Sequence, residues 1–194
     1  MLNLGKHLMN SAVLCAVISC QHQDKSTELP YPDIEQVSVA TGGCYGQCPF
    51  LAVEINRDLT CKYYGGEFSS PTGFFTGRIN QELWDSLNTG LVGADFISYT
   101  QPDINMVDGM YFELVLEYQD SAYRYMIPDV YLPPQGDTIS AREQQEARML
   151  ASLHWVVRRV SHSQLVRVPD TLEFKTRIQY EHLPPPPILS ETGS

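Results

Sequence analysis

Positive charge is scarce in this 194-residue sequence, which contains 13 Lys and Arg residues against 23 Asp and Glu residues. The formal net charge is −10 at pH 7. Affinity for nucleic acids depends on Lys and Arg side chains that neutralise phosphate groups, and the same side chains draw proteins to anionic lipids. We therefore expect no nucleic-acid partner and no membrane association that rests on charge alone.

Long apolar runs are also scarce. An apolar run over residues 8–19 contains only three polar residues, and it follows the weakly positive pair Lys6 and His7. This run is too short for a membrane-spanning helix, which needs about 20 apolar residues. A short positive segment followed by a run of this length is typical of a signal peptide. We expect no membrane-spanning segment elsewhere in the sequence.

The apolar run ends in Val17-Ile18-Ser19-Cys20. This tetrapeptide resembles the bacterial lipobox, in which an aliphatic residue, a small residue before the cleavage point and a cysteine stand in order. The resemblance implies that residues 1–19 are a signal peptide and that the Cys20 thiol carries lipid, so that Cys20 anchors the mature protein in a membrane. Several acyl chains together hold a protein durably, whereas one does so only marginally.

Residues 20–32 are polar and include two prolines, which is typical of a tether. Gln21 follows the expected cleavage point, so the Asp that retains enterobacterial lipoproteins at the inner membrane is missing. We expect a lipid-anchored protein of the cell envelope, with the outer membrane favoured and the globular domain in the periplasm or at the surface.

Cysteine is scarce as well, with five in the sequence, of which Cys20, Cys44, Cys48 and Cys61 would remain after cleavage. In an oxidising envelope a nearby pair is expected to form a disulfide. Cys44 and Cys48 are the obvious pair, because Gly46 between them permits a tight turn. Cys61 has no evident partner, and the sequence does not decide whether it is free.

The hydrophobic pattern predicts an α+β fold. Asn80 is expected to cap the first helix, and Ser140 with Glu143 forms a capping box for the second. The order β-β-β-(β)-α-β-β-α predicts an antiparallel sheet of hairpins with two helices packed on one face. The predicted strands are 34–40, 50–56, 60–64, 74–79, 110–118 and 122–127, the helices 81–92 and 140–160, and an edge strand 172–180.

The same pattern divides the mature chain into three parts. Residues 33–160 are expected to form the globular domain, and residues 161–182 a C-terminal extension that contains the edge strand. Residues 183–194 contain a run of four prolines at 184–187 and are expected to form a disordered tail.

The most distinctive stretch is Cys44-Tyr45-Gly46-Gln47-Cys48-Pro49. It resembles the signature Cys-[Tyr/Phe]-Gly-x-Cys-Pro of a bacterial family of domains of unknown function, often found in lipoproteins. The resemblance extends over roughly residues 34–160. Leu59 stands where the family usually has a turn glycine, and Leu51 where it usually has an aromatic residue. The family implies no activity.

The two paired cysteines also permit a redox interpretation, in which Cys44 and Cys48 are the centre of a thiol-disulfide oxidoreductase. Reactive pairs are usually Cys-x-x-Cys at a helix N-terminus, which lowers the pKa of a thiol. Here the spacing is one residue longer and a strand follows, so we favour a structural disulfide. Cys44, Cys48 and Cys61 lack the fourth ligand expected of structural zinc.

Other polar residues offer no recognisable chemistry. His154 lies beside the apolar stripe of the second helix with no nucleophile to activate, which leaves a hydrolase hypothesis unsupported. Asp95, Asp103 and Asp108 do not follow a calcium-loop spacing. Gly42-Gly43 is not followed by the Lys-Ser/Thr of a phosphate loop. We therefore expect no catalytic residues, no cofactor and no metal.

Our leading hypothesis is a non-catalytic binding or structural domain with an envelope protein as partner. The candidate contact loop is Tyr45, Gly46 and Gln47, together with the loop at residues 97–109. The alternative hypothesis is the thiol-disulfide oxidoreductase that uses Cys44 and Cys48.

Overall fold

A computed structural model describes residues 34–42, 44, 46–101, 109–118, 121–129, 139–169 and 172–180. These residues belong to one unit of the chain, Tyr31–Ser194. The expected signal peptide, Cys20, the tether, Tyr45, most of the 97–109 loop and the proline-rich tail lie outside the described residues. Within the described part, no helix is both long and apolar enough to cross a membrane.

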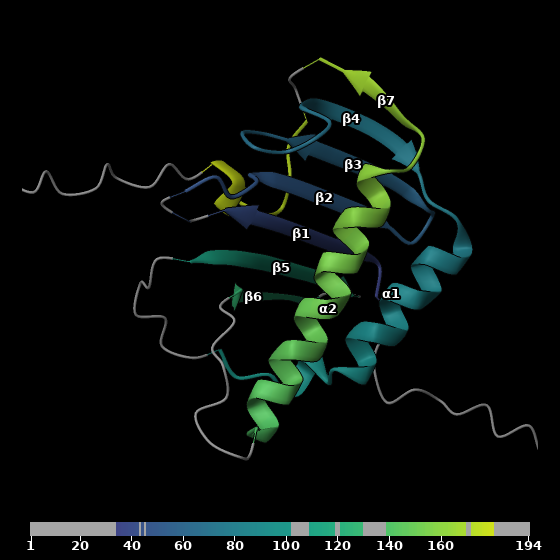
Figure 1. The fold of residues 1–194 in the computed structure, drawn as a ribbon. Coiled ribbons are helices and arrows are strands. Elements are labelled where there is room, and N and C mark those ends of the chain that lie inside the picture. Colours follow the sequence, from purple (N-terminus) through teal and green to yellow (C-terminus); the bar gives the residue numbers. More distant parts are fainter. Residues whose placement is uncertain are drawn as a thin grey trace, which may run out of the picture. The chain divides into compact units, whose positions relative to one another are not determined.

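Seven strands form one sheet in which every neighbouring pair is antiparallel (Figure 1). Their order across the sheet is β6-β5-β1-β2-β3-β4-β7. The hairpins predicted from the alternating pattern are therefore present. The strands are β1 (Gln36–Gly42), β2 (Leu51–Asn56), β3 (Thr60–Gly65), β4 (Gly73–Arg78), β5 (Met110–Tyr118), β6 (Ser121–Asp129) and β7 (Leu165–Val168).

Two helices, α1 (Gln81–Gly93) and α2 (Ala141–Ser161), pack on the same face of this sheet (Figure 1). The Asn80 side chain accepts a hydrogen bond from the Leu83 amide at 2.9 Å, which caps α1. The Ser140 hydroxyl accepts from the Glu143 amide at 3.2 Å, and the Glu143 carboxylate accepts from the Ser140 amide at 2.7 Å. Both predicted caps are confirmed, and so is the α+β fold class.

The apolar core lies between the sheet and the helices. Alternate residues of the strands point toward α1 and α2, because successive side chains of a strand point to opposite faces. Leu87 and Leu153 are fully buried in this layer, and the Cys61 side chain lies in it as well. The principal contributors are Val37, Val39, Val53, Ile55, Leu114, Leu116, Leu83, Trp84, Leu91, Met149, Val156 and Val160.

The turn between β2 and β3 places a leucine in a backbone conformation that favours glycine. Leu59 adopts a positive φ of 70°, a conformation that branched residues rarely take. Its side chain packs against the core, and the Asp58 carboxylate accepts hydrogen bonds from the amide and hydroxyl of Thr60 at 2.9 and 2.6 Å. These contacts hold the turn in a conformation that costs leucine on the order of 1 kcal/mol.

The prediction of an edge strand at residues 172–180 is wrong. The edge strand is β7, at Leu165–Val168, which pairs with β4. Residues 172–180, here called the strap, cross the face of the sheet opposite α1 and α2 and end in a short 3-10 helix, Ile178–Tyr180 (Figure 1). The strap alternates between exposed and buried side chains because one side faces the sheet, yet its backbone joins no strand ladder.

Candidate functional site

The predicted disulfide joins Cys44 to Cys48, with 6.1 Å between their Cα atoms. It closes the connection between β1 and β2, where the Thr41 hydroxyl donates a hydrogen bond to the Pro49 carbonyl at 2.6 Å. Gly46 and Gln47 are exposed, as a contact loop requires. The pair precedes strand β2, so no helix N-terminus is present to lower the pKa of either thiol.

Cys61 is the one free cysteine among the described residues, and it is buried. Burial raises the pKa of its thiol to about 11, so that it is protonated at neutral pH. Cys61 faces the helix side of β3, paired with Ile55, whereas the disulfide loop adjoins the other end of that hairpin. The four steps along the strand from Cys61 to Gly65 span roughly 13 Å. Cys61 is therefore not placed to attack the disulfide.

Several aromatic side chains lie on the strand ends and the connection that adjoin the disulfide loop. The Phe50 amide donates to the Glu67 carbonyl at 3.0 Å, which joins the loop to the β3–β4 connection. Phe68 in that connection is 55% exposed. The Tyr64 ring lies 4.7 Å from the ring of Phe74 and 5.5 Å from that of Tyr180, between centroids. We call the surface formed by Phe50, Tyr64, Phe68, Phe74 and Tyr180 the aromatic end.

The strap completes this surface. Tyr180 is 46% exposed, and it reaches Tyr64 because the strap passes close to β1. A Cβ atom at Gly42 would lie 2.8 Å from the Ile178 carbonyl oxygen, so glycine permits the approach. Residues far apart in the sequence are thus brought together at the end of the sheet that carries the disulfide.

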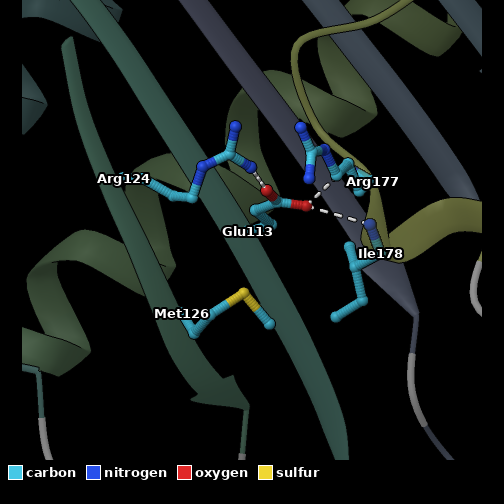
Figure 2. A pocket seen from close by; sticks show the side chains of 5 residues that line it. All are labelled: Glu113, Arg124, Met126, Arg177 and Ile178. Atoms are coloured by element: carbon cyan, nitrogen blue, oxygen red, sulfur yellow. Dashed lines mark hydrogen bonds and ion pairs between the residues drawn. The ribbon is translucent and has the colours of Figure 1, made fainter.

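Two buried carboxylates hold the strap, and neither was singled out from the sequence. The Glu113 side chain on β5 is only 3% exposed. One carboxylate oxygen contacts the Arg124 guanidinium, and the other accepts hydrogen bonds from the Arg177 and Ile178 amides at 2.7 and 2.9 Å (Figure 2). A cavity of about 310 Å³ beside this cluster is also lined by Met126.

Glu54 on β2 repeats this arrangement nearby. It is 2% exposed, lies 2.6 Å from the Lys62 ammonium and accepts from the Lys175 amide at 3.3 Å. The two cations also donate to strap carbonyls: Lys62 to that of Glu173 at 3.2 Å and Arg124 to that of Lys175 at 3.0 Å. Such charge-assisted bonds are each worth about 1.5–3 kcal/mol. These acidic groups therefore hold a segment and are not free for acid–base chemistry.

In the sequence, each of these two glutamates stands within an otherwise apolar strand segment. Glu54 stands within Ala52-Val53-Glu54-Ile55, and Glu113 within Phe112-Glu113-Leu114. A carboxylate on the solvent side of a strand is common, so the alternation by itself does not show that the site is buried. The covering segment lies at least 60 residues further along, and only the tertiary structure reveals it.

The His154 side chain makes structural contacts with β5 and β6. Its Nε2 lies 3.0 Å from an Asp129 carboxylate oxygen, and its ring packs edge-on against Phe112 with 4.7 Å between centroids. Asp95 adopts a positive φ of 52° before a short 3-10 helix, whereas Asp103 and Asp108 lie outside the described residues. No group of three or more potential metal ligands occurs within the part of the chain that the structure describes.

Comparison with known proteins identifies one domain. The family described as "Domain of unknown function (DUF6438)" matches residues 35–129, so this stretch carries a DUF6438 domain. The match includes β1 to β6, α1, the disulfide and both strap-holding carboxylates, whereas α2, β7 and the strap lie beyond it. No curated protein matches the chain. The domain of unknown function is confirmed, while its signature motif and association with lipoproteins stay predictions.

Proposed function

We propose that this protein is a lipid-anchored component of the cell envelope whose domain binds another envelope component without catalysing a reaction. The anchor in this proposal is Cys20, and the binding surface is the aromatic end with its disulfide loop. The outer membrane is the favoured location, because Gln21 follows the proposed acylated cysteine.

The observation that carries the binding role is the exposure of Phe68 and Tyr180, at 55% and 46%, at the end of the sheet that carries the disulfide loop. Exposed aromatic side chains grouped in a patch are typical of protein contact sites. The disulfide loop and the strap restrain this surface, which lowers the conformational entropy that binding costs. The polar candidates for catalysis, in contrast, are engaged in structural contacts: Glu54, Glu113 and His154.

A photo-crosslinking amino acid at Gln47, an exposed position of the loop, tests the binding role in intact cells. We expect a discrete crosslinked partner, and we expect its yield to fall at least fivefold when Phe68→Ser and Tyr180→Ser are introduced together. Val166→Ser is the control, because Val166 is also an exposed apolar residue, at 67%, but lies on edge strand β7. A yield that is the same in the double variant and in the control would overturn this surface.

Metabolic labelling with an alkyne fatty acid tests the anchor separately. The wild-type chain is expected to incorporate label and to fractionate with membranes, and Cys20→Ser to lose both properties. Labelling that persists in Cys20→Ser, or a wild-type chain without label, would refute the anchor while leaving the binding surface open to its own test.

A further inference from the structure

A groove of about 630 Å³ lies where α1 begins and α2 ends, next to the end of β4. It is lined by Arg78, Arg159, His162 and Trp155, among others. Its volume falls within the range of pockets that hold small organic molecules. The groove is separate from the aromatic end, since Arg78 closes β4 at the end opposite Gly73 and the β3–β4 connection.

Among the described residues, the two arginines of the groove form no ion pair with a carboxylate. Arg78 acts on one only at longer range: Thr60 hydrogen bonds and, after them, the Arg78 charge lower the pKa of Asp58. The Arg78 guanidinium donates to the Asp58 backbone carbonyl at 2.9 Å, while the Asp58 carboxylate is engaged by Thr60. The Arg159 guanidinium lies over the Trp155 ring, 5.8 Å from its centroid, as a cation–π pair.

Further lining groups favour an anion. His162 uses Nδ1 in contacts with the Arg158 carbonyl and the Ser161 hydroxyl, at 2.8 and 3.1 Å, and Nε2 has no such contact with a described residue. Glu82 is the one carboxylate among the lining residues that the structure describes. A positive lining is unusual for a chain with a net charge of −10.

The rest of the lining is mixed: Ile79, Leu83 and Trp155 form an apolar part beside the uncharged polar residues Asn80, Ser86, Ser163 and Gln164. Ile79 and Leu83 are largely buried, and Trp155 is half-buried. Pockets that combine an apolar lining with a few convergent polar groups bury the body of a ligand and orient its polar end. An inorganic ion alone would leave this apolar surface uncovered.

We propose that this groove binds a small organic anion: a phosphate, sulfonate or carboxylate group attached to an apolar, aromatic-sized body. Arg78 and Arg159 contact the anionic group, and Trp155 with Leu83 contacts the body. The guanidinium groups are positioned before binding, which lowers the entropic cost of recognition. This site does not involve Cys20 or the aromatic end. A test of anion binding is therefore independent of the tests of the proposed envelope role.

The probe for this site is 8-anilinonaphthalene-1-sulfonate, an aromatic anion whose fluorescence rises in apolar surroundings. We expect the full-length chain to bind it saturably at one site, and inorganic phosphate to compete. Arg78→Gln and Arg159→Gln should each weaken binding about tenfold, the loss of one charge-assisted contact. The uncharged analogue N-phenyl-1-naphthylamine should also bind about tenfold more weakly than the sulfonate.

Arg158→Gln is the matched control, since Arg158 is exposed, precedes Arg159 on α2 and does not line the groove. It removes the same charge and should change affinity less than twofold. Thermal unfolding of each variant separates lost binding from lost folding, and Arg159→Gln leaves the Arg78–Asp58 contact intact. Equal effects of Arg158→Gln and Arg159→Gln, equal binding of the neutral analogue, or absence of saturable binding would overturn the proposal.

Discussion

The two faces of the sheet are covered in different ways. The face that packs against α1 and α2 is apolar, and Leu87, Leu153 and Val156 are completely buried there. The opposite face carries Glu54 and Glu113, and it is covered by an extended strap held through carboxylate-to-amide bonds. One cover is therefore stabilised mainly by removal of apolar surface from water, and the other by directional polar contacts together with a small apolar cluster that contains Ile178.

This difference has consequences for stability and for opening. Apolar burial is spread over many side chains, so the helix face resists local opening. The strap is held by two buried carboxylates, and loss of Glu113 leaves the Arg124 guanidinium and two backbone amides without their acceptor. We expect the strap to open before the helices separate from the sheet.

The largest expected effect is on the helix face. Leu153→Ala removes buried methyl groups and should lower the free energy of unfolding by about 2–5 kcal/mol, measured by urea titration. Val166→Ala is the control, because Val166 is 67% exposed at the edge of the other face. The control should remain within about 0.5 kcal/mol of the wild type. Similar losses in both variants would contradict the proposed difference between the faces.

On the strap face, Glu113→Ala should lower the free energy of unfolding by about 2–3 kcal/mol, because it leaves strap amides without an acceptor. Hydrogen exchange of the Arg177 and Ile178 amides should become much faster, while the amides of α2 keep their protection. The partly exposed Glu117, which lies 3.0 Å from the Lys175 ammonium, provides the control Glu117→Gln. That control should cost no more than about 1 kcal/mol. Unchanged exchange in the strap of Glu113→Ala would refute the holding role.

The disulfide belongs to neither face, because it closes a five-residue loop at the end of the sheet. Replacing Cys44 and Cys48 together by Ser should cost about 2 kcal/mol in the chain-entropy account. A structural bond should also show a reduction potential below about −300 mV, by alkylation and mass spectrometry. A potential between about −230 and −120 mV would instead favour the oxidoreductase hypothesis.

The effect that is smallest at neutral pH concerns the Cys61 thiol, which faces the helices, whereas its neighbour Lys62 faces the strap. Burial raises the pKa of the Cys61 thiol from 9.0 to about 11, so the folded state holds this proton more tightly than the unfolded chain. The resulting stability is present below pH 9 and is lost as the pH rises from about 9 to about 11. Cys61→Ala should flatten the unfolding free energy over this window, whereas an unchanged slope would contradict it.

The hydrophobic pattern predicted most elements because local signals and tertiary packing agree there. The expected strand 110–118 coincides with β5, and the expected helix 81–92 is one residue shorter than α1. Leu83, Leu87 and Leu91 recur at helical spacing, and Asn80 marks the start of the helix. The prediction of the edge strand was wrong for a physical reason. The true edge strand, β7, is only four residues long, whereas the strap alternates between exposed and buried side chains without pairing with a strand.

The candidate site was predictable only in part. The pairing of Cys44 with Cys48 follows from their separation, since a closed loop this short needs no distant residue. The aromatic end cannot be predicted from nearby residues in the sequence, because Tyr180 is brought next to Tyr64 by the path of the strap. The groove of Arg78 and Arg159 depends likewise on the packing of α1 beside α2.

The amino-acid sequence by itself determined the fold class, the helix caps and the disulfide, because each depends on residues within a few positions of one another. Only the tertiary structure decided the role of Glu54 and Glu113, since a carboxylate on an alternating strand is exposed or buried according to what covers it. The cover comes from residues 172–180, and their contacts with β2 and β5 are set by the three-dimensional path of the chain, which hydrophobic periodicity does not encode.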